Sequence, residues 1–181
     1  MHPSESLRFS IHLPRPLWIF LGTVAFVVMA IAVRIGLPIY RQRVAIREFE
    51  RLGGFVELQN GGPVWLRRVV GDRWMTPFQE VVHVGLGGSQ VTDSNLIHLE
   101  QMPNLEWLVL TDTQISDPGL VYLQGLNKLT ILDLEGTQVT NAGLEHLKEL
   151  TALQWLYLCR TEVTPPGVAK LQAALPSVRI R

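Results

Sequence analysis

The chain has 181 residues, in which 16 lysines and arginines balance 16 aspartates and glutamates. This length predicts one folded domain, and the lack of a basic surplus argues against a nucleic-acid-binding protein. The single cysteine, Cys159, excludes a disulfide framework within the chain.

A long uncharged segment lies close to the N-terminus, over residues 17–33. As a helix it would span about 25 Å, and an extension to Tyr40 brings it to the roughly 30 Å of a bilayer hydrocarbon core. Trp18 and Tyr40 lie near its ends, where aromatic side chains favour the membrane interface. We therefore expect an N-terminal tail over residues 1–16 and a transmembrane helix, the anchor, over residues 17–40.

A cleaved signal peptide is the alternative, because Ala30, Ile31 and Ala32 form a small-residue cleavage site. Arginines that crowd the downstream side argue against cleavage, and by the positive-inside rule they favour a cytoplasmic C-terminal domain. These arginines are Arg34, Arg41, Arg43 and Arg47. The expectation is a single-pass membrane protein whose C-terminal domain is cytoplasmic.

Residues 41–80 are expected to form a juxtamembrane helix and an N-terminal cap for the rest of the domain. The helix should end at the Gly53-Gly54 pair, and a strand over residues 55–59 follows it. Pro63 would open a second short helix, whose apolar residues are Trp65, Leu66, Val69 and Val70.

One motif recurs with a period of 24 residues over residues 81–175. The aligned columns include Leu108, Leu132 and Leu156; Leu110, Leu134 and Leu158; Thr113, Thr137 and Thr161; and Gly119, Gly143 and Gly167. A diverged first copy places Val84, Leu86 and Ser89 in the same columns. Three strong copies and one diverged copy therefore predict four repeated units.

Each unit switches from strand periodicity to helix periodicity. Leu108 and Leu110 alternate with Trp107 and Val109, as in a strand with one buried face. The second half follows helical spacing at Leu120, Leu123 and Leu126. Hydroxyl residues stand where helix N-caps are expected, at Ser116, Thr140 and Thr164.

A unit of strand, turn and short helix can bury its apolar face only against its neighbours. The predicted fold class is therefore α/β, a short solenoid of four units preceded by the transmembrane helix. Residues 176–181 break the register and are expected to add a C-terminal cap strand with Val178 and Ile180.

A column of hydroxyl residues follows the strand of every unit, namely Ser89, Thr113, Thr137 and Thr161. Backbone groups that turn out of a sheet need hydrogen-bond partners when they are buried. We assign these side chains a structural role, so Thr137→Val should cost about 1–3 kcal/mol of folding free energy.

The repeat pattern L-x-x-L-x-L-x-x-T-x-[VI]-[TS]-[DN]-x-G-L resembles a leucine-rich repeat. With its cap, residues 17–181 resemble small bacterial membrane-anchored leucine-rich repeat proteins. The repeats are also similar to those of F-box leucine-rich proteins, which would imply a substrate adaptor, but no F-box precedes them. The resemblance implies the fold and is not specific for an activity.

Leucine-rich repeats place the outward strand side chains on a concave sheet face. This implies a partner-binding surface that includes Val109 and an aromatic and aliphatic strip of Trp107, Ile131, Trp155 and Tyr157, with Asp112, Asp133 and Glu135 as a negative flank. Trp and Tyr dominate interface hot spots. The alternative is that the aromatic side chains are covered by the cap or stack for stability.

No catalytic, cofactor or metal site is expected. His98 and His146 share a column two units apart, about 10 Å or more, which is too far for one metal ion. Residues 85–90, GLGGSQ, lack the Lys-Ser/Thr of a phosphate loop. Asp133 and Glu135 share a strand face but have no enclosing cleft.

The expected function is a non-catalytic protein–protein interaction module, tethered to a membrane, whose partner is a protein or peptide. The alternatives are a structural or scaffold component of a membrane assembly and a substrate adaptor. A third, enzymatic reading would need a pocket of titratable groups, which the sequence does not reveal.

Overall fold

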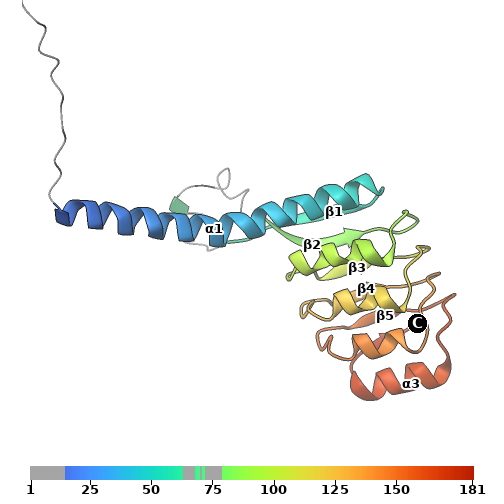
Figure 1. Ribbon diagram of the computed structural model, residues 1–181. Coiled ribbons are helices and arrows are strands. Elements are labelled where there is room, and N and C mark those ends of the chain that lie inside the picture. The colour runs from blue at the N-terminus through green and yellow to red at the C-terminus, as the bar shows by residue number, and fades with distance from the viewer. Residues whose placement is uncertain (1–14, 63–67, 70, 72–78) are drawn as a thin grey trace, which may run out of the picture. The chain divides into compact units, whose positions relative to one another are not determined.

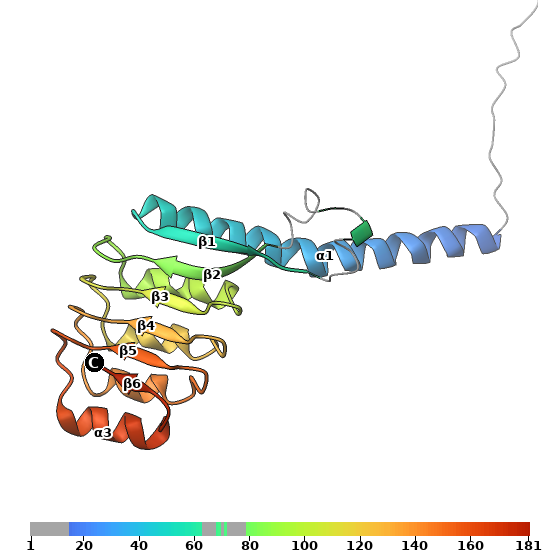
Figure 2. The same ribbon diagram turned by 180° about the vertical axis from the view of Figure 1, so that it is seen from behind.

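The computed structural model describes residues 15–62, 68–69, 71 and 79–181. The chain divides into two compact units, residues 1–38 and residues 39–181. The ribbon is drawn from two opposite sides in Figure 1 and Figure 2.

Helix α1 spans Arg15–Arg51 and contains Pro38. It ends before Gly53, whose φ of 91° lies in the left-handed region that glycine adopts without strain. In the first unit its large apolar side chains are exposed, including Ile19, Phe20, Phe26, Val28 and Met29.

Among the described residues, no helix combines the length and the apolar character required to cross a membrane. The anchor expected over residues 17–40 is therefore not confirmed and stays a prediction. Most of the expected tail, residues 1–14, lies outside the described part of the chain.

The second unit contains one sheet of six strands in chain order. The parallel strands are β2 (Gln79–Gly85), β3 (Trp107–Val109), β4 (Ile131–Asp133), β5 (Trp155–Tyr157) and β6 (Arg179–Ile180). Every residue pair between neighbouring strands from β2 to β6 joins residues one sequence period apart, as Leu108 and Leu132 are. The sequence period is therefore the spacing of neighbouring strands, and each column becomes a row across the sheet.

The return segment of every unit is helical, and in three of the four units it is a 3₁₀ helix. These segments are η3 (Asp93–Gln101), η4 (Asp117–Leu123), η5 (Gly143–Leu147) and the α-helix α3 (Pro165–Ala174). They cover one side of the sheet, as the two ribbon views show (Figures 1 and 2). Leucines of the strands and of the helical segments fill the layer between the sheet and these segments. They include Leu108, Leu132, Leu156, Leu120 and Leu147, all fully buried.

The first turns of these helices are joined across units by an acid or amide side chain. The pairs are Asp93 with Ser116, Asp117 with Thr140 and Asn141 with Thr164. In the second pair, the backbone N and Oγ1 of Thr140 donate to the two carboxylate oxygens of Asp117 at 2.8 and 2.7 Å. Ser116 and Thr164 occupy the expected N-cap positions without capping their own helices, and η5 begins later than expected, after Ala142.

The repeated glycine is explained by the same contact. A Cβ atom at Gly143 would collide with Oδ1 of Asp117, and Gly119 and Gly167 are in the same position relative to the preceding unit. The first unit has Asn95 in the glycine column, and the last has Pro165 in the acid column. The acid or amide thus occurs in the three units that contact a following unit, and the glycine occurs in the three units that contact a preceding unit.

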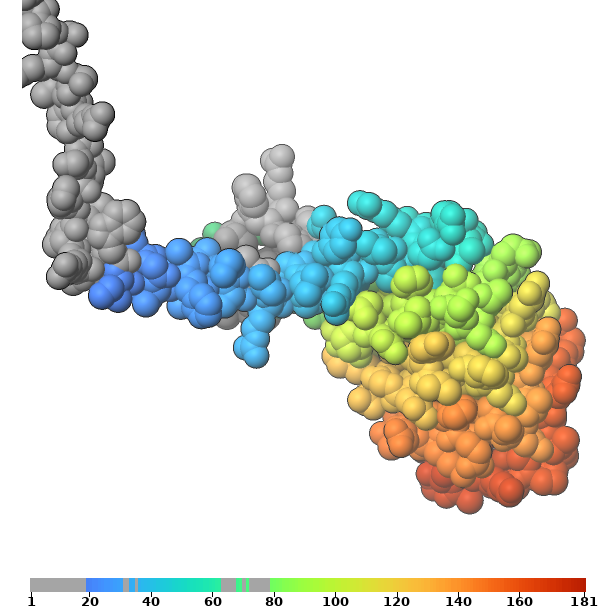
Figure 3. All heavy atoms as spheres, in the orientation of Figure 1, coloured from blue at the N-terminus to red at the C-terminus, as the bar shows by residue number. Residues whose placement is uncertain are grey.

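The two ends of the stack differ. At the N-terminal end, β1 (Phe55–Asn60) pairs antiparallel with β2, and Phe49 of α1 is fully buried in the core. The short helix expected from Pro63 lies mostly outside the described residues. At the C-terminal end, β6 pairs with β5 and Val178 is buried. Figure 3 shows the units following one another from green to red.

Candidate functional site

The outward side chains of the strands form a row across the sheet. Trp107 is the cross-strand neighbour of Ile131, and Ile131 is the cross-strand neighbour of Trp155. Neighbouring strands lie about 4.8 Å apart, so these three side chains lie side by side across the sheet. Trp107 is 42% exposed, whereas Ile131 and Trp155 are half-buried. Three side chains of the strip expected from the sequence, Trp107, Ile131 and Trp155, are thus brought together in space as one row.

Charged and polar side chains complete both ends of this row. At the first end, Nδ1 of His83 lies 2.7 Å from Oε2 of Glu57 on β1, and its ring contacts the Trp107 ring edge-to-face at 5.2 Å. At the other end, the guanidinium carbons of Arg179 and Arg181 lie 4.9 and 5.2 Å from the centroid of the Trp155 ring. Trp155 is therefore partly covered by arginine side chains.

Sequence reasoning missed Arg179 and Arg181 as part of this surface. The signal was available, because one further period from Trp155 leads to residue 179 and one from Tyr157 leads to residue 181. Both arginines lie beyond the break in the leucine pattern, within the segment 176–181 that is expected to form a cap strand. Glu57 gives no such signal, because β1 is antiparallel and outside the repeat.

A second row runs beside the first. Val109, Asp133 and Tyr157 are cross-strand neighbours, and all three are half-buried. The Tyr157 ring stacks on Trp155 with a centroid distance of 6.5 Å. The Phe55 ring occupies the space where a Cβ of Gly85 would lie, which extends the apolar surface onto β1.

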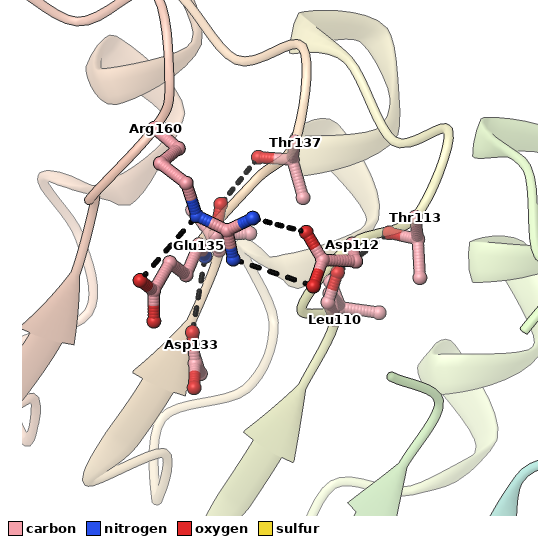
Figure 4. Close-up of polar contacts among 8 residues, drawn as sticks. Leu110, Asp112, Thr113, Asp133, Glu135, Thr137 and Arg160 are labelled. Atoms are coloured by element: carbon pink, nitrogen blue, oxygen red, sulfur yellow. Dashed lines mark hydrogen bonds and ion pairs between the residues drawn. The ribbon is translucent and has the colours of Figure 1, made fainter. Parts of the chain in front are cut away.

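One cation, Arg160, pairs with two of the three carboxylates of the expected negative flank. Nη1 of Arg160 lies 3.0 Å from Oδ1 of Asp112, and Nε lies 3.7 Å from Oε1 of Glu135 (Figure 4). The hydrogen bond with Asp112 is the main cause of the raised pKa of Arg160, followed by the charge of the same carboxylate. Of the three carboxylates of this flank, only that of Asp133 forms no ion pair in the described chain, and its Oδ1 accepts the backbone N–H of Glu135 at 3.0 Å.

Gly136 lies between the two partners of this ion pair. Its φ is 68°, and a Cβ there would collide with the Asp112 carboxylate and approach the Arg160 guanidinium. The same column has positive φ at Gly88, Asp112 and Arg160. Arg160 can reach across two units because the intervening unit has no side chain at this position.

The threonine column has the geometry of a structural element. Oγ1 of Thr113, Thr137 and Thr161 donates to the strand carbonyl three residues earlier, at 2.6, 2.6 and 2.7 Å. Thr113 and Thr137 are buried. Oγ of Ser89 is buried without a hydrogen-bond partner in the described chain, so the first unit lacks this bond.

Several polar and aromatic side chains of the helix side are half-buried, among them His98, His146 and Tyr122. The His98 ring contacts Phe49 edge-to-face at 6.0 Å, and Nδ1 of His146 lies 3.3 Å from Nε2 of Gln124 in the preceding unit. These side chains contribute to contacts between neighbouring segments, whereas Lys170 is exposed.

Chemically reactive groups do not converge in the described part of the chain. There, no cluster of three His, Cys, Asp or Glu side chains could hold a metal ion. Cys159 is exposed and borders an apolar hollow of about 460 Å³ at the end of the stack, next to Val163, Val168 and Ile180. A more polar hollow of about 610 Å³ is lined by Trp155, Arg179 and residues that lie just before β4, β5 and β6.

One comparison with known proteins matches the repeat. A family model described as "Leucine Rich repeat" matches residues 101–123 and 125–149. A search of curated proteins finds no match to the chain.

Solved structures of leucine-rich repeat proteins resemble parts of this one. A leucine-rich repeat protein of Leptospira interrogans shares 21% identity over 67% of this chain and 28% of its own, with a TM-score of 0.45. An internalin of Listeria monocytogenes shares 23% identity over 55% of this chain and 34% of its own, with a TM-score of 0.40.

The leucine-rich repeat ectodomain of the receptor kinase SOBIR1 from Arabidopsis thaliana shares 15% identity over 77% of this chain and 89% of its own, with a TM-score of 0.40. This chain spans about a third or less of the length of the first two proteins. Residues 101–123 and 125–149 thus match the leucine-rich repeat family, and the same 24-residue period, parallel sheet and buried core continue in the units on either side.

Proposed function

We propose that the repeat domain is a protein-interaction module that binds a protein or peptide through the exposed side chains of its sheet. The observation that carries the proposal is the continuous row of Trp107, Ile131 and Trp155 on adjacent strands. Large aromatic side chains at the surface lower the solubility of a domain unless a partner covers them, and they contribute most to binding when they are covered.

Interaction through this row requires that its side chains are dispensable for folding. Trp107 is partly exposed and belongs to the outward face, whereas the inward leucines of the same strands form the core. Removal of the Trp107 side chain should therefore weaken partner binding much more than it lowers the free energy of unfolding. The proposal assigns no catalytic role to the surface.

The test is capture of partners by the full-length chain, followed by titration of any captured protein after its purification. Trp107→Ala is compared with Val121→Ala, which removes a similarly exposed apolar side chain on the helix side, 44% exposed. We expect Trp107→Ala to lose the partner while both variants keep the wild-type melting temperature. Equal capture by both variants would contradict binding through the sheet.

A structural or scaffold role predicts a different result. In that case the full chain would associate through α1, and substitutions in the row would leave its assembly unchanged. A substrate adaptor would additionally require a second partner that is retained when Trp107 is replaced.

We also propose that residues 17–40 attach the domain to a membrane as a single span, with the repeats on the cytoplasmic side. The support is the exposure of Ile19, Phe20 and Phe26 along this part of α1, since apolar side chains of this size are stable at a surface that lipid or protein covers. Alkaline extraction of membranes that contain the full chain tests this. Release of the chain, or an N-terminus that begins near residue 33, would contradict the proposal.

A further inference from the structure

The row ends on two arginines that are not neutralised. Arg179 is the cross-strand neighbour of Trp155, and Arg181 follows it at the end of the chain. Both are exposed, and both guanidinium groups lie against the Trp155 ring. In the described residues neither forms an ion pair, in contrast to Arg160, which is held by two carboxylates.

Polar groups surround this end of the row. The hollow of about 610 Å³ is lined by Thr130, Thr151, Gln154, Trp155, Ser177 and Arg179. The hydroxyl of Thr130 already donates to the carbonyl of Glu106 at 3.0 Å. Thr151, Gln154 and Ser177 can donate hydrogen bonds beside the guanidinium of Arg179, which suits the oxygens of a carboxylate.

The charge along the row is asymmetric. At the β1 end, the carboxylate of Glu57 lies against His83. Of the acidic side chains on the middle strands, Glu135 is paired with Arg160, and Asp133 accepts a backbone N–H. Only the β6 end therefore offers cations without carboxylate partners in the described chain.

We propose that this surface binds an extended peptide in which an acidic side chain contacts Arg179 and Arg181 and an apolar side chain contacts Trp107 and Ile131. This rests on the proposed function and specifies the chemistry of the partner. Strands β4 and β3 lie two and three strands from β6, which corresponds to about 10 and 14 Å. An extended peptide rises about 3.3 Å per residue, so the two side chains should lie about three or four residues apart.

A single-stranded nucleic acid could also stack on Trp155, but the charges favour the peptide. Binding along a nucleic-acid backbone requires a basic groove, and this surface has two unpaired arginines with the carboxylate of Asp133 on the neighbouring row. The whole chain carries no net charge.

The probe is a random dodecapeptide phage library, selected on the full-length chain immobilised in mild detergent. We expect enriched peptides to carry Asp or Glu about three or four residues from an aromatic or aliphatic residue. Synthetic copies are then titrated against the wild type, Arg179→Gln/Arg181→Gln, and the control Lys170→Gln, which removes an exposed cation from α3 on the helix side.

We expect the double variant to lose about tenfold or more in affinity, a loss typical of removing charge-assisted hydrogen bonds. Lys170→Gln should bind as the wild type does, and wild-type affinity should fall with added salt. The backbone bonds of Arg181 with Leu156 and Leu158 do not involve the side chain, so the double variant should fold. A melting curve checks this, and Arg181→Gln alone replaces the double variant if it does not fold.

Three results would overturn the inference. Enriched peptides without acidic residues, or with affinity unchanged in the arginine variants, would overturn it while leaving the interaction module intact. Tighter binding of a single-stranded oligonucleotide, lost in the arginine variants, would also overturn it. Absence of any enriched peptide that depends on Trp107 would contradict both the inference and the proposed function.

Discussion

The junctions between units and the outward face of the sheet follow opposite rules, although both are built from aligned columns. At the junctions, the acid or amide, the hydroxyl and the glycine are nearly the same in each unit. On the outward face, the column that contains Trp107 reads His83, Trp107, Ile131, Trp155 and Arg179.

This difference follows from the geometry of stacking. A junction side chain meets the same surroundings in each unit, so the same residue satisfies the same hydrogen bonds. An outward side chain meets other outward side chains and solvent, so its identity is free of the stacking requirement. A column that varies while its neighbours repeat is where a solenoid can acquire a binding surface.

The largest effect on stability is expected at a junction. Asp117→Ala removes both acceptors of Thr140 and leaves a half-buried N–H without its partner, so it should cost about 2–3 kcal/mol. Urea denaturation measures the free energy of unfolding. A loss similar to that of a surface substitution would mean that junction bonds do not hold the stack.

A double-mutant cycle sharpens this point. Gly143→Ala should destabilise the fold by about 1–3 kcal/mol because its methyl group collides with the Asp117 carboxylate and Leu120. In Asp117→Ala/Gly143→Ala the first collision is absent, so the combined cost should fall short of the sum by about 1 kcal/mol. Strict additivity would show that the two residues are not coupled.

The turn column gives the next effect. Gly136→Ala combines a positive φ with a collision at Asp112, and Gly88→Ala has the same φ with open space around it. The left-handed backbone alone should lower the free energy of unfolding by about 1 kcal/mol in Gly88→Ala. In Gly136→Ala the collision adds to this, and the loss should be about 2 kcal/mol. Equal melting temperatures would show that the Arg160 ion pair adjusts without cost.

Substitutions in the hydroxyl column should have a smaller effect on stability, and this effect should differ between Thr137 and Ser89. Thr137→Val is expected to cost about 1 kcal/mol, at the low end of the sequence expectation, because the carbonyl of Leu134 keeps the backbone N–H of Thr137. Ser89→Ala removes a hydroxyl without a partner in the described chain, so it should change stability by less than about 0.5 kcal/mol. A larger loss for Ser89→Ala would reverse the interpretation of the column.

The smallest effect is expected on the outward face. Arg160→Gln breaks an exposed ion pair with Asp112, and exposed pairs contribute little. The melting temperature should stay at the wild-type value, and any small shift should vanish in high salt. A clear loss of stability that persists in high salt would mean that outward side chains also hold the stack.

Repetition made much of this structure predictable. The 24-residue period leads directly to parallel strands, buried leucines and a row of outward side chains, because equivalent residues of stacked units become neighbours. The 24-residue period and the alternation of apolar and polar residues can be recognised from the order of residues, without knowing which residues meet in space. The row of Trp107, Ile131 and Trp155 could therefore be named from spacing alone.

The contacts that cross units were less accessible. The role of the glycine column depends on how closely Asp117 of one unit approaches the next, and the pairing of Arg160 with Asp112 joins residues 48 positions apart. The half-burial of His98 depends on Phe49, which lies outside the repeat. Each depends on side-chain directions and distances that the period does not specify.

By itself, the sequence determined the repeated unit, its strand and helix halves and the faces they bury, since hydrophobic periodicity reports burial directly. Only the tertiary structure decided which charges remain available on the sheet. Arg160 pairs with Asp112 and Glu135 across three turns, whereas Arg179 and Arg181 lie against Trp155 without a carboxylate partner in the described chain. The physical reason is that electrostatic pairing depends on distance in space, and stacking brings together residues that the chain keeps far apart.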